Sequence, residues 1–295
     1  MPSTQEFRRR IKSVNNTKQI TKAMEMIASI KMQKSVRTIA QARSYIQNAW
    51  NILHMVTQKA LSEDHPLIKA TLANRTAVIL ITSDRGLCGS YNAEVIKKYI
   101  SFIRNSSTDI EVDIIAIGKV GAAYVKRYKL GNLVAEFKGL ESNVSVEDII
   151  PISKLTNGEF LAGKYNKVTI IYSHFVSSLK QTPVVKQILP ITADHIDNTD
   201  LWIAANSNDE TEFKFEPDPA AVIDGILLQI LRVQLYGAVL EANASEHSAR
   251  MVAMKSATDN ANSLIDELTL IYNSVRQDNI TKEIAEIAGA AEAMK

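Results

Sequence analysis

The sequence predicts an α/β protein: a long antiparallel coiled coil of the N- and C-terminal helices, plus a central, doubly wound, mainly parallel sheet domain. Two observations predict the helices, since residues 3–60 contain neither glycine nor proline and no proline follows Pro219. A third predicts the sheet, because strand-like and helix-like apolar patterns alternate in the middle of the chain. The expected divisions are an N-terminal helix over 1–65, a central domain over 66–217 and a C-terminal helix over 218–295.

The N-terminal helix is expected to begin at a capping box, in which Ser3 is followed three residues later by Glu6. A helix over this stretch would be about 85 Å long, ending between Ser62 and Pro66 because the residue before a proline avoids helical geometry. Apolar residues spaced by three and four predict its buried seam, with a phase slip at Lys34 and Arg37. They are Ile20, Ala23, Ile27 and Ile30, then Ile39, Ala42, Ile46, Ala49, Leu53, Val56 and Ala60.

The C-terminal helix has a plausible start at Asp218 and Pro219, a side-chain acceptor followed by a residue that needs no amide hydrogen bond. Its length would be about 115 Å. The expected seam is Met254, Ala257, Ala261, Leu264, Leu268, Ile271 and Val275. Because a whole domain connects the two helices, we expect an antiparallel pair. Two separate helices packed on the middle domain are the alternative, and their length argues against it.

The middle of the chain alternates strand and helix patterns. Strands are expected at 76–82, 111–117, 133–137, 167–173 and 184–191, with helices from Asn92 to Ile103, over 119–129 and within 144–163, the last beginning or bending at Pro151. Pro183 and Pro190 bound the last of these strands. Residues 194–217 are polar and irregular, with an edge strand expected at Glu212–Phe215.

Composition bounds the function. With 46% hydrophobic and 22% charged residues, the chain resembles a soluble globular protein, and no run of 18 apolar residues predicts a membrane span. The single cysteine excludes an intramolecular disulfide and a cysteine-based zinc cluster. Residues 1–60 carry 11 Lys/Arg against 2 Asp/Glu, whereas 218–295 carry 6 against 11. Oppositely charged helices are either complementary neighbours or simply two solvated faces.

The loop Ser83–Gly89, SDRGLCG, follows a predicted strand where a Rossmann-like fold binds phosphate. It lacks both the GK[ST] of a phosphate loop and the GxGxxG pattern, which favours a tight turn or a partner contact. Cys88 has Arg85 nearby but no histidine close in sequence, so a nucleophilic role is disfavoured. The five histidines show no paired metal-ligand spacing.

Three stretches together resemble the gamma subunit of F-type ATP synthase. They are IKSVNNTKQITKAMEMIASIKM at Ile11–Met32, SDRGLCGSYN at Ser83–Asn92, and the segment from Ala249 to Ala293 that begins ARMVAMKSATDNANSLIDEL. The match spans the full length and the combination is specific. One departure is Ser90, where the family usually has a second glycine.

The resemblance implies a non-catalytic rotor. In that family the terminal helices enter a hexamer of alpha and beta subunits, while the middle domain meets the epsilon subunit and the c-ring. No cofactor, metal, small-molecule substrate or nucleic acid is expected. A peripheral position on the cytoplasmic face of the bacterial plasma membrane is implied, with the matrix side of the mitochondrial inner membrane as the alternative.

The resemblance also implies contact residues. Arg276, Gln277 and Thr281 match the positions that grip a beta-subunit loop, and Met24 is expected to face the same region. Further candidates for partner contact are Arg8, Arg9, Arg10, Lys12, Arg85 and Cys88. No aromatic residues alternate with the arginine triplet, so the pattern does not favour nucleic-acid binding. Two interpretations of the triplet remain: contact with an acidic protein partner, and a solvated helix face.

Two other function classes remain open from the residues alone. A nucleotide-binding α/β enzyme with helical arms would bind nucleotide in isolation, although the missing phosphate-loop residues speak against it. A static coiled-coil scaffold would bind partners without any coupling to their turnover.

Overall fold

The computed structural model describes residues 4–60, 65–69, 71, 73–105, 110–141, 144–191 and 219–294. The structure divides into two compact units. The helix-pair unit comprises residues 1–29 and 250–295, and the sheet unit comprises 30–249. Two long helices, α1 (Thr4–Ala60) and α6 (Pro219–Ala293), each contribute to both units.

The sheet unit contains five strands in the order β3-β2-β1-β4-β5. The four strands from β3 to β4 are parallel, as the alternating pattern predicts, and β5 is antiparallel to β4. Their bounds are β1 (Arg75–Ile81), β2 (Glu111–Ile117), β3 (Asn132–Phe137), β4 (Lys167–Phe175) and β5 (Gln181–Leu189). The predicted α/β class and mainly parallel sheet are therefore confirmed.

The edge strand β5 differs from its prediction at both ends. It begins at Gln181 and runs through Pro183, which is paired with Ser173 of β4. Pro183 was expected to bound this strand from outside, and that expectation is wrong. A proline has no amide hydrogen to donate, but β5 has a strand neighbour on only one side, so the missing donor breaks no bond there.

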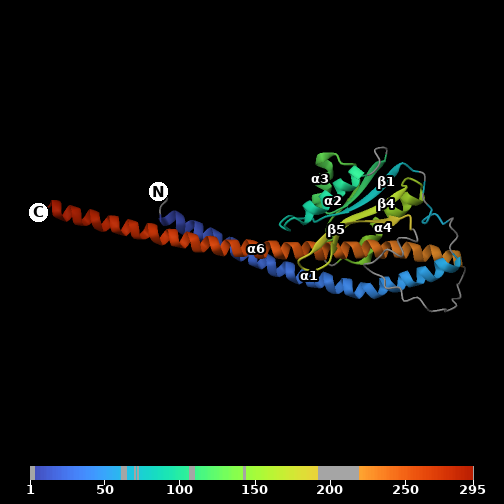
Figure 1. Cartoon of the computed structure of the whole chain (residues 1–295), viewed down its shortest axis with the longest axis horizontal. Helices are drawn as coiled ribbons and strands as arrows, with labels where there is room; N and C mark the ends of the chain where they lie inside the picture. Colours follow the sequence, from blue (N-terminus) through green and yellow to red (C-terminus); the bar gives the residue numbers. More distant parts are fainter. Residues whose placement is uncertain are drawn as a thin grey trace. The chain divides into compact units, whose positions relative to one another are not determined.

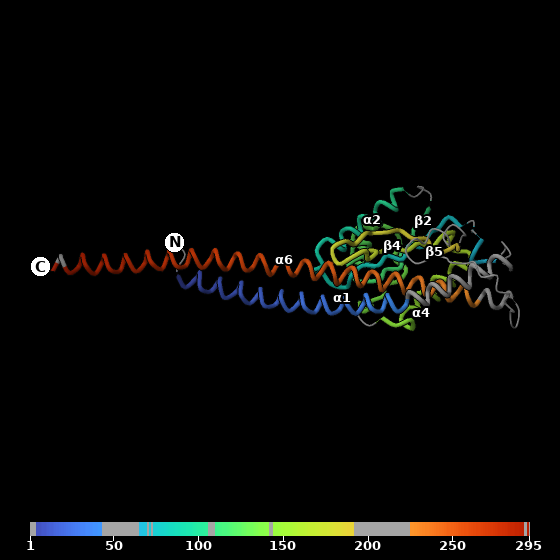
Figure 2. The backbone as a smooth tube through the Cα atoms, turned by 60° about the horizontal axis from the view of Figure 1, so that its bottom comes forward, coloured from blue at the N-terminus to red at the C-terminus, as the bar shows by residue number. Residues whose placement is uncertain are grey.

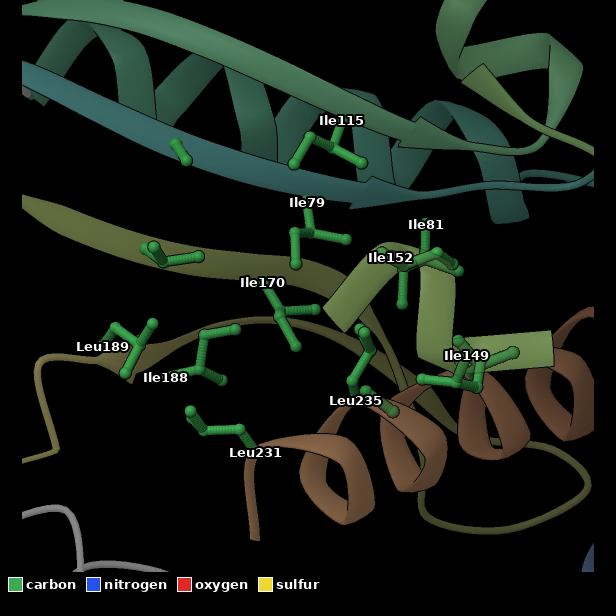
Figure 3. Close-up of a cluster of buried hydrophobic side chains, with 14 of the residues drawn as sticks. Ile79, Ile81, Ile115, Ile149, Ile152, Ile170, Ile188, Leu189, Leu231 and Leu235 are labelled. Carbon is green, nitrogen blue, oxygen red and sulfur yellow. The ribbon is translucent and has the colours of Figure 1, made fainter. Parts of the chain in front are cut away.

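Helices cover both faces of the sheet (Figure 1). Helices α2 (Tyr91–Asn105) and α3 (Lys119–Tyr128) pack on the face that carries Val78 and Leu80. Helices α4 (Val146–Leu161) and α6 pack on the face that carries Ile79 and Ile81 (Figure 3). Because successive side chains of a strand point to opposite faces, a continuous apolar run is buried on both.

Helix α4 begins earlier than the proline inside it suggests. Ser145 is its N-cap, and the Ser145 and Asp148 side chains form a reciprocal capping box with each other's backbone amides. The prediction that this helix begins at Pro151 is wrong. The capping box satisfies free amides of the first turn and so begins the helix ahead of Pro151, which lies inside α4 and donates no hydrogen bond to the preceding turn.

In the helix-pair unit, the start of α1 and the end of α6 lie side by side and run antiparallel (Figures 1 and 2). A hydrogen bond of 2.8 Å joins the hydroxyls of Thr21 and Thr258 across the pair. The predicted antiparallel coiled coil is confirmed, but its seam on α6 is shifted. The inward side chains are Met254, Thr258, Ala261, Ile265, Leu268, Tyr272 and Val275. Leu264 and Ile271, placed in the seam by the sequence pattern, are exposed.

The seam predicted for the first half of α1 is wrong. Ile20, Ile27 and Ile30 are 60%, 56% and 68% exposed. The inward side chains of α1 in the helix-pair unit instead include Phe7, Ile11, Val14, Thr21 and Ala28. The error has a physical reason. The Thr21 and Thr258 hydroxyls bond to each other and to the Lys18 and Met254 carbonyls of their own helices, which allows polar residues to replace apolar ones in the seam.

The second predicted row of α1 is tested only at its start, where Ile39 and Ala42 are half-buried against the sheet-unit core. The side chains from 43 to 60, residues 61–64, Ser3, Asp218 and the strand expected at Glu212–Phe215 lie outside what the structure describes. Within α6, the stretch Gly225–Ala291 is long and apolar enough to cross a membrane by length and composition alone. Of its tested apolar window 61% is buried inside the protein, which is the pattern of a core helix.

Candidate functional site

In the helix-pair unit, α6 continues past the start of α1. Thr4, the first residue of α1, lies 17 residues before Thr21, so it is level with Val275, which lies 17 residues after Thr258. Every side chain from 276 to 291 is exposed. Beyond Val275, no described residue of the helix-pair unit covers α6, and we call residues 276–291 the single-helix end.

Three of the sequence-predicted contact residues lie in the first two turns of the single-helix end. Arg276, Gln277 and Thr281 are all exposed, and the Thr281 hydroxyl donates to the Gln277 carbonyl at 2.9 Å. Met24 is half-buried in the paired region, where it is level with Lys255. At 1.5 Å per residue that is about 30 Å from Arg276, so the structure does not bring Met24 together with the other three.

The basic residues near the start of α1 are exposed in the helix-pair unit. Arg8, Arg9 and Lys12 point away from the seam, and Arg10 forms an ion pair of 2.6 Å with Glu6 one turn earlier. An exposed pair of this kind contributes little to stability. These cations are therefore accessible on the free chain.

Apolar side chains also cover the outer surface of the helix-pair unit. On α1, Ile20 and Ile27 are exposed, and on α6 Leu264, Leu270 and Ile271 are exposed, with Leu270 72% exposed. Single exposed apolar residues are common on proteins, whereas several along one pair of helices make a candidate surface for another protein. We call these five residues the outer apolar rows.

In the sheet unit, the loop after β1 is held by its own side chains. The Ser83 amide donates to Asn92 Oδ1 at 3.0 Å, and Asn92 Nδ2 donates back to Ser83 Oγ at 2.7 Å. Cys88 is buried in this loop, whereas Arg85 and Leu87 are exposed. The loop therefore presents an arginine and a leucine at its surface and keeps the thiol inside.

Asp84 of this loop lies at the N-terminus of α3, the helix that follows the neighbouring strand β2. Its Oδ1 accepts from the amide of Lys119 at the start of α3 at 3.0 Å, and its Oδ2 accepts from the Gly139 amide at 2.7 Å. Its own amide donates to the Glu141 carboxylate at 3.1 Å. A carboxylate at a helix N-terminus satisfies the free amides that would otherwise bind an anion. The geometry thus favours the structural interpretation of this loop.

Packing explains the glycine that follows β2. Gly118 has φ 97°, and a Cβ at this position would lie 2.1 Å from the carbonyl oxygen of Thr82. Only glycine tolerates both the positive φ and this approach. The same Thr82 places its hydroxyl 2.9 Å from the Gly121 amide as an acceptor, so β1 and α3 are locked together.

The sequence reasoning missed one feature of α6 within the sheet unit. From 237 to 248 every residue is buried, although the stretch includes two glutamates, an asparagine and a histidine. Six side chains hydrogen-bond outward to the rest of the unit, and we call them the polar band: Tyr236, Glu241, Asn243, Ser245, His247 and Ser248.

One side of the polar band binds the segment between β3 and α4. Asn243 Nδ2 donates to the Leu140 carbonyl at 2.7 Å, and the Tyr236 hydroxyl donates to the Val144 carbonyl at 3.3 Å. His247 Nε2 lies 3.0 Å from the Glu141 carbonyl. Because a carbonyl oxygen only accepts, Nε2 carries the hydrogen.

The other side of the polar band binds the end of β4 and the turn after it. Glu241 Oε2 accepts from His174 Nδ1 at 2.6 Å. Ser245 donates to the Ser173 carbonyl at 2.9 Å, and Ser248 to the Ser178 carbonyl at 2.6 Å. Since Asn243 and Ser245 are two residues apart, they point to nearly opposite sides of the helix. Turning α6 about its axis would break both sets of bonds.

Charge burial in the polar band perturbs its neighbours. Burial lowers the pKa of the Lys186 ammonium group, and the carboxylate of Glu241 acts in the opposite direction. Burial, with the same carboxylate, raises the pKa of the Tyr172 phenol well above its usual value. In the part of the chain that is described, no three His, Cys, Asp or Glu side chains gather as metal ligands.

A sequence signal for the polar band does exist. Residues 237–248 read GAVLEANASEHS, which combines small residues with short polar ones and contains no lysine or arginine. Small side chains allow close approach on every side of a helix, and polar side chains buried there must find partners.

Comparison with known proteins identifies relatives over the whole chain. A profile of the ATP synthase family (ATP-synt) matches residues 3–294. The ATP synthase gamma chain of Nitrosomonas europaea is 40% identical over 100% of both chains, and that of Roseiflexus castenholzii is 41% identical over 100% of this chain and 99% of its own.

Solved structures share the fold. A chain of the Euglena gracilis mitochondrial ATP synthase, from the structure of its OSCP/F1/c-ring, aligns with a TM-score of 0.67 and 18% identity over 99% of this chain and 94% of that one. A chain from the rotor of the same enzyme aligns with a TM-score of 0.63 and 20% identity over 94% and 98%. Because the family profile covers residues 3–294 and the two bacterial gamma chains are 40% and 41% identical over the whole chain, this chain belongs to the gamma-chain family of ATP synthase.

Proposed function

We propose that this chain is the central rotor shaft of an F-type ATP synthase. It couples rotation of a membrane c-ring to ATP synthesis, and in reverse to ATP hydrolysis, on a hexamer of alpha and beta subunits. The chain itself is non-catalytic, and the nucleotide sites belong to the hexamer. Its place is peripheral, on the cytoplasmic face of a bacterial plasma membrane, as the bacterial relatives favour. The mitochondrial inner membrane is the alternative.

The observation that carries the proposal is the surface of the helix-pair unit. The outer apolar rows are exposed on both helices, and the single-helix end continues beyond them with every side chain accessible. An isolated helix of this length is marginal in water. A surrounding collar of apolar partner surface would stabilise both features, which is what insertion into a hexamer supplies.

Specific contacts are assigned to residues of the helix-pair unit and of the loop after β1. Arg276, Gln277 and Thr281 at the single-helix end grip a loop of the beta subunit, and Met24 contacts the hexamer at a second level of the pair. The cations Arg8, Arg9, Arg10 and Lys12 face acidic beta-subunit loops. Arg85 contacts a partner directly, while the buried Cys88 shapes the loop that presents it.

The polar band supports the mechanical part of the proposal. A shaft transmits torque only if the driven domain cannot slip around it. Hydrogen bonds from opposite sides of α6 would resist such slipping, because each broken bond leaves a buried polar group unsatisfied at about 1–3 kcal/mol. The sheet unit is the part assigned to the epsilon subunit and the c-ring.

Reconstitution tests the proposal. The full chain is mixed with alpha and beta subunits of a gamma-chain relative's enzyme, and a bead is attached through Lys98→Cys on the exposed face of α2, in a background where the buried Cys88 is serine. ATP-dependent rotation in one direction is expected. A stable, ATP-hydrolysing complex without rotation would indicate a static scaffold. Nucleotide binding by the isolated chain without any complex would support an enzyme instead.

A further inference from the structure

A pocket of about 260 Å³ lies within the sheet unit, beside the polar band. Lys31, Lys34 and Ser35 of α1 line one wall, and Asn243 and His247 of α6 line another. We propose that this pocket binds the phosphate group of a small anion, either free phosphate or a small phosphate monoester.

The α1 wall provides three donors on one face. Residues 31, 34 and 35 are spaced by three and four, so their side chains lie together on the helix surface. Lys31 is half-buried, and the structure gives it no ion pair or hydrogen bond among the residues described. Lys34 is exposed, which places it at the mouth. Two ammonium groups and a hydroxyl match the terminal oxygens of a phosphate, for which lysine is a common ligand.

The charge balance favours an anion. Glu141 contributes the one carboxylate among the residues lining this pocket, against the two lysines. That carboxylate already accepts a hydrogen bond of 3.1 Å from the Asp84 amide. With a neutral histidine the lining carries a net charge of +1. A partly enclosed site strengthens this attraction relative to open water.

The α6 wall is fixed before any ligand arrives. Asn243 and His247 are both buried, and each donates to a backbone carbonyl, at 2.7 Å to Leu140 and at 3.0 Å to Glu141. Side chains held in this way lose little conformational entropy when a ligand binds. The polar band therefore preorganises one side of the pocket.

The size of the pocket indicates what accompanies the phosphate. A volume of about 260 Å³ exceeds what a bare phosphate fills and lies just below the range of drug-sized ligands. Val144 and Leu240 add an apolar surface to the lining. A small polyol phosphate would place its phosphate at the lysines and its carbon skeleton against this surface. Binding would also tie α1 to α6 and so raise the melting temperature of the chain.

The test uses the full chain in isolation, so its outcome is independent of the rotor proposal. Inorganic phosphate and glycerol 3-phosphate are titrated separately at constant ionic strength, by equilibrium dialysis and by thermal unfolding. We expect saturable binding at one site and a rise in melting temperature. A tighter complex with glycerol 3-phosphate would identify a monoester site, and equal affinity would identify a free-phosphate site.

Variants locate the binding. Lys31→Ala and Ser35→Ala should each weaken the complex about tenfold, since each removes a charge-assisted hydrogen bond to the phosphate. Lys98→Ala, which removes an exposed lysine on α2 of the same unit, should leave affinity unchanged. Melting temperatures without ligand show whether each variant is folded. Absence of saturable binding, or binding equally strong in the Lys31 and Ser35 variants, would overturn the proposal.

Discussion

One helix passes through two environments in this molecule. Between 237 and 248, α6 is buried on every side, and its polar band is bonded to two separate parts of the sheet unit. Between 276 and 291 the same helix is exposed on every side. Both segments are continuous α-helix, so backbone hydrogen bonding does not distinguish them. The difference lies in the side chains. Those of the first segment contact the rest of this chain, whereas those of the second are accessible to another protein.

The two segments, 237–248 and 276–291, have different sources of stability. In the sheet unit, apolar burial and the hydrogen bonds of the polar band act together around α6. At the single-helix end only helix propensity and local hydrogen bonds remain, such as that of Thr281 to Gln277. Substitutions in the first segment should therefore change the stability of the free chain, whereas those in the second should change partner binding.

The largest expected effect is that of Glu241→Ala. This change removes the acceptor of His174 Nδ1 and the carboxylate near the half-buried Lys186. We expect a loss of about 4 kcal/mol in the free energy of unfolding, measured by urea denaturation. Glu283→Ala, at an exposed position of the single-helix end, should cost less than about 0.5 kcal/mol. Similar values for the two variants would remove the distinction between the segments.

A matched pair of leucines on α6 comes next. Leu231 is buried in the sheet-unit core, so Leu231→Ala should destabilise the chain by about 3 kcal/mol through lost burial and a cavity. Leu270 is exposed, and Leu270→Ala should change stability by less than about 0.5 kcal/mol. Leu270→Ala should instead weaken assembly with alpha and beta subunits in a pull-down titration. Unchanged assembly would argue against a partner surface at the outer apolar rows.

The threonine pair tests how a polar seam position is tolerated. Thr258→Val should cost about 1 kcal/mol, because it removes the hydrogen bond across the pair and leaves the Thr21 hydroxyl only the Lys18 carbonyl of its own helix. The double variant Thr21→Val/Thr258→Val should recover most of that loss, since both polar groups are then replaced by isosteres. A double-mutant cycle measured by thermal unfolding gives the coupling. Additive losses would show that the two hydroxyls do not depend on each other.

The smallest expected effect is a pH dependence from Lys186. Its pKa in the folded chain is lowered by burial, whereas in the unfolded chain it is about 10.4. The folded state thus carries a cost below its own pKa that disappears as pH rises toward the unfolded value. Relative to Lys186→Met, the stability of the parent chain should increase with pH across that window. A difference independent of pH would contradict this assignment.

Much of the sheet could be predicted because its strands are continuous β-branched runs. The expected strand 111–117 agrees with β2 at both ends. Pro183 misled the prediction for β5, since a proline limits a central strand but not an edge strand. A capping box likewise outweighed Pro151 as the signal for the start of α4.

The helix seams could not be predicted reliably, for a different reason. On α6 the rows through Ala257, Leu264 and Ile271 and through Thr258, Ile265 and Tyr272 both have heptad spacing. Apolar periodicity shows which faces are covered, but not whether the cover is this chain or another. On α1 the row of Ile20, Ile27 and Ile30, predicted to face α6, is exposed. A threonine in the seam could be predicted only together with the threonine of the other helix that bonds to it.

The candidate site likewise has one part that could be predicted from the sequence and one part that could not. The proposed contacts Arg276, Gln277 and Thr281 come from the family resemblance, which points to single positions, and the structure shows that all three are exposed. The polar band was missed because its partners are mostly backbone carbonyls, which leave no side-chain pattern elsewhere in the sequence.

Hydrogen–deuterium exchange along α6 tests the central contrast most directly, on the free chain and on its complex with alpha and beta subunits. We predict slow exchange at 237–248 in both samples, and fast exchange at 276–291 in the free chain that becomes slow in the complex. Equal protection of the two segments in the free chain, or no gain at 276–291 on assembly, would contradict the account.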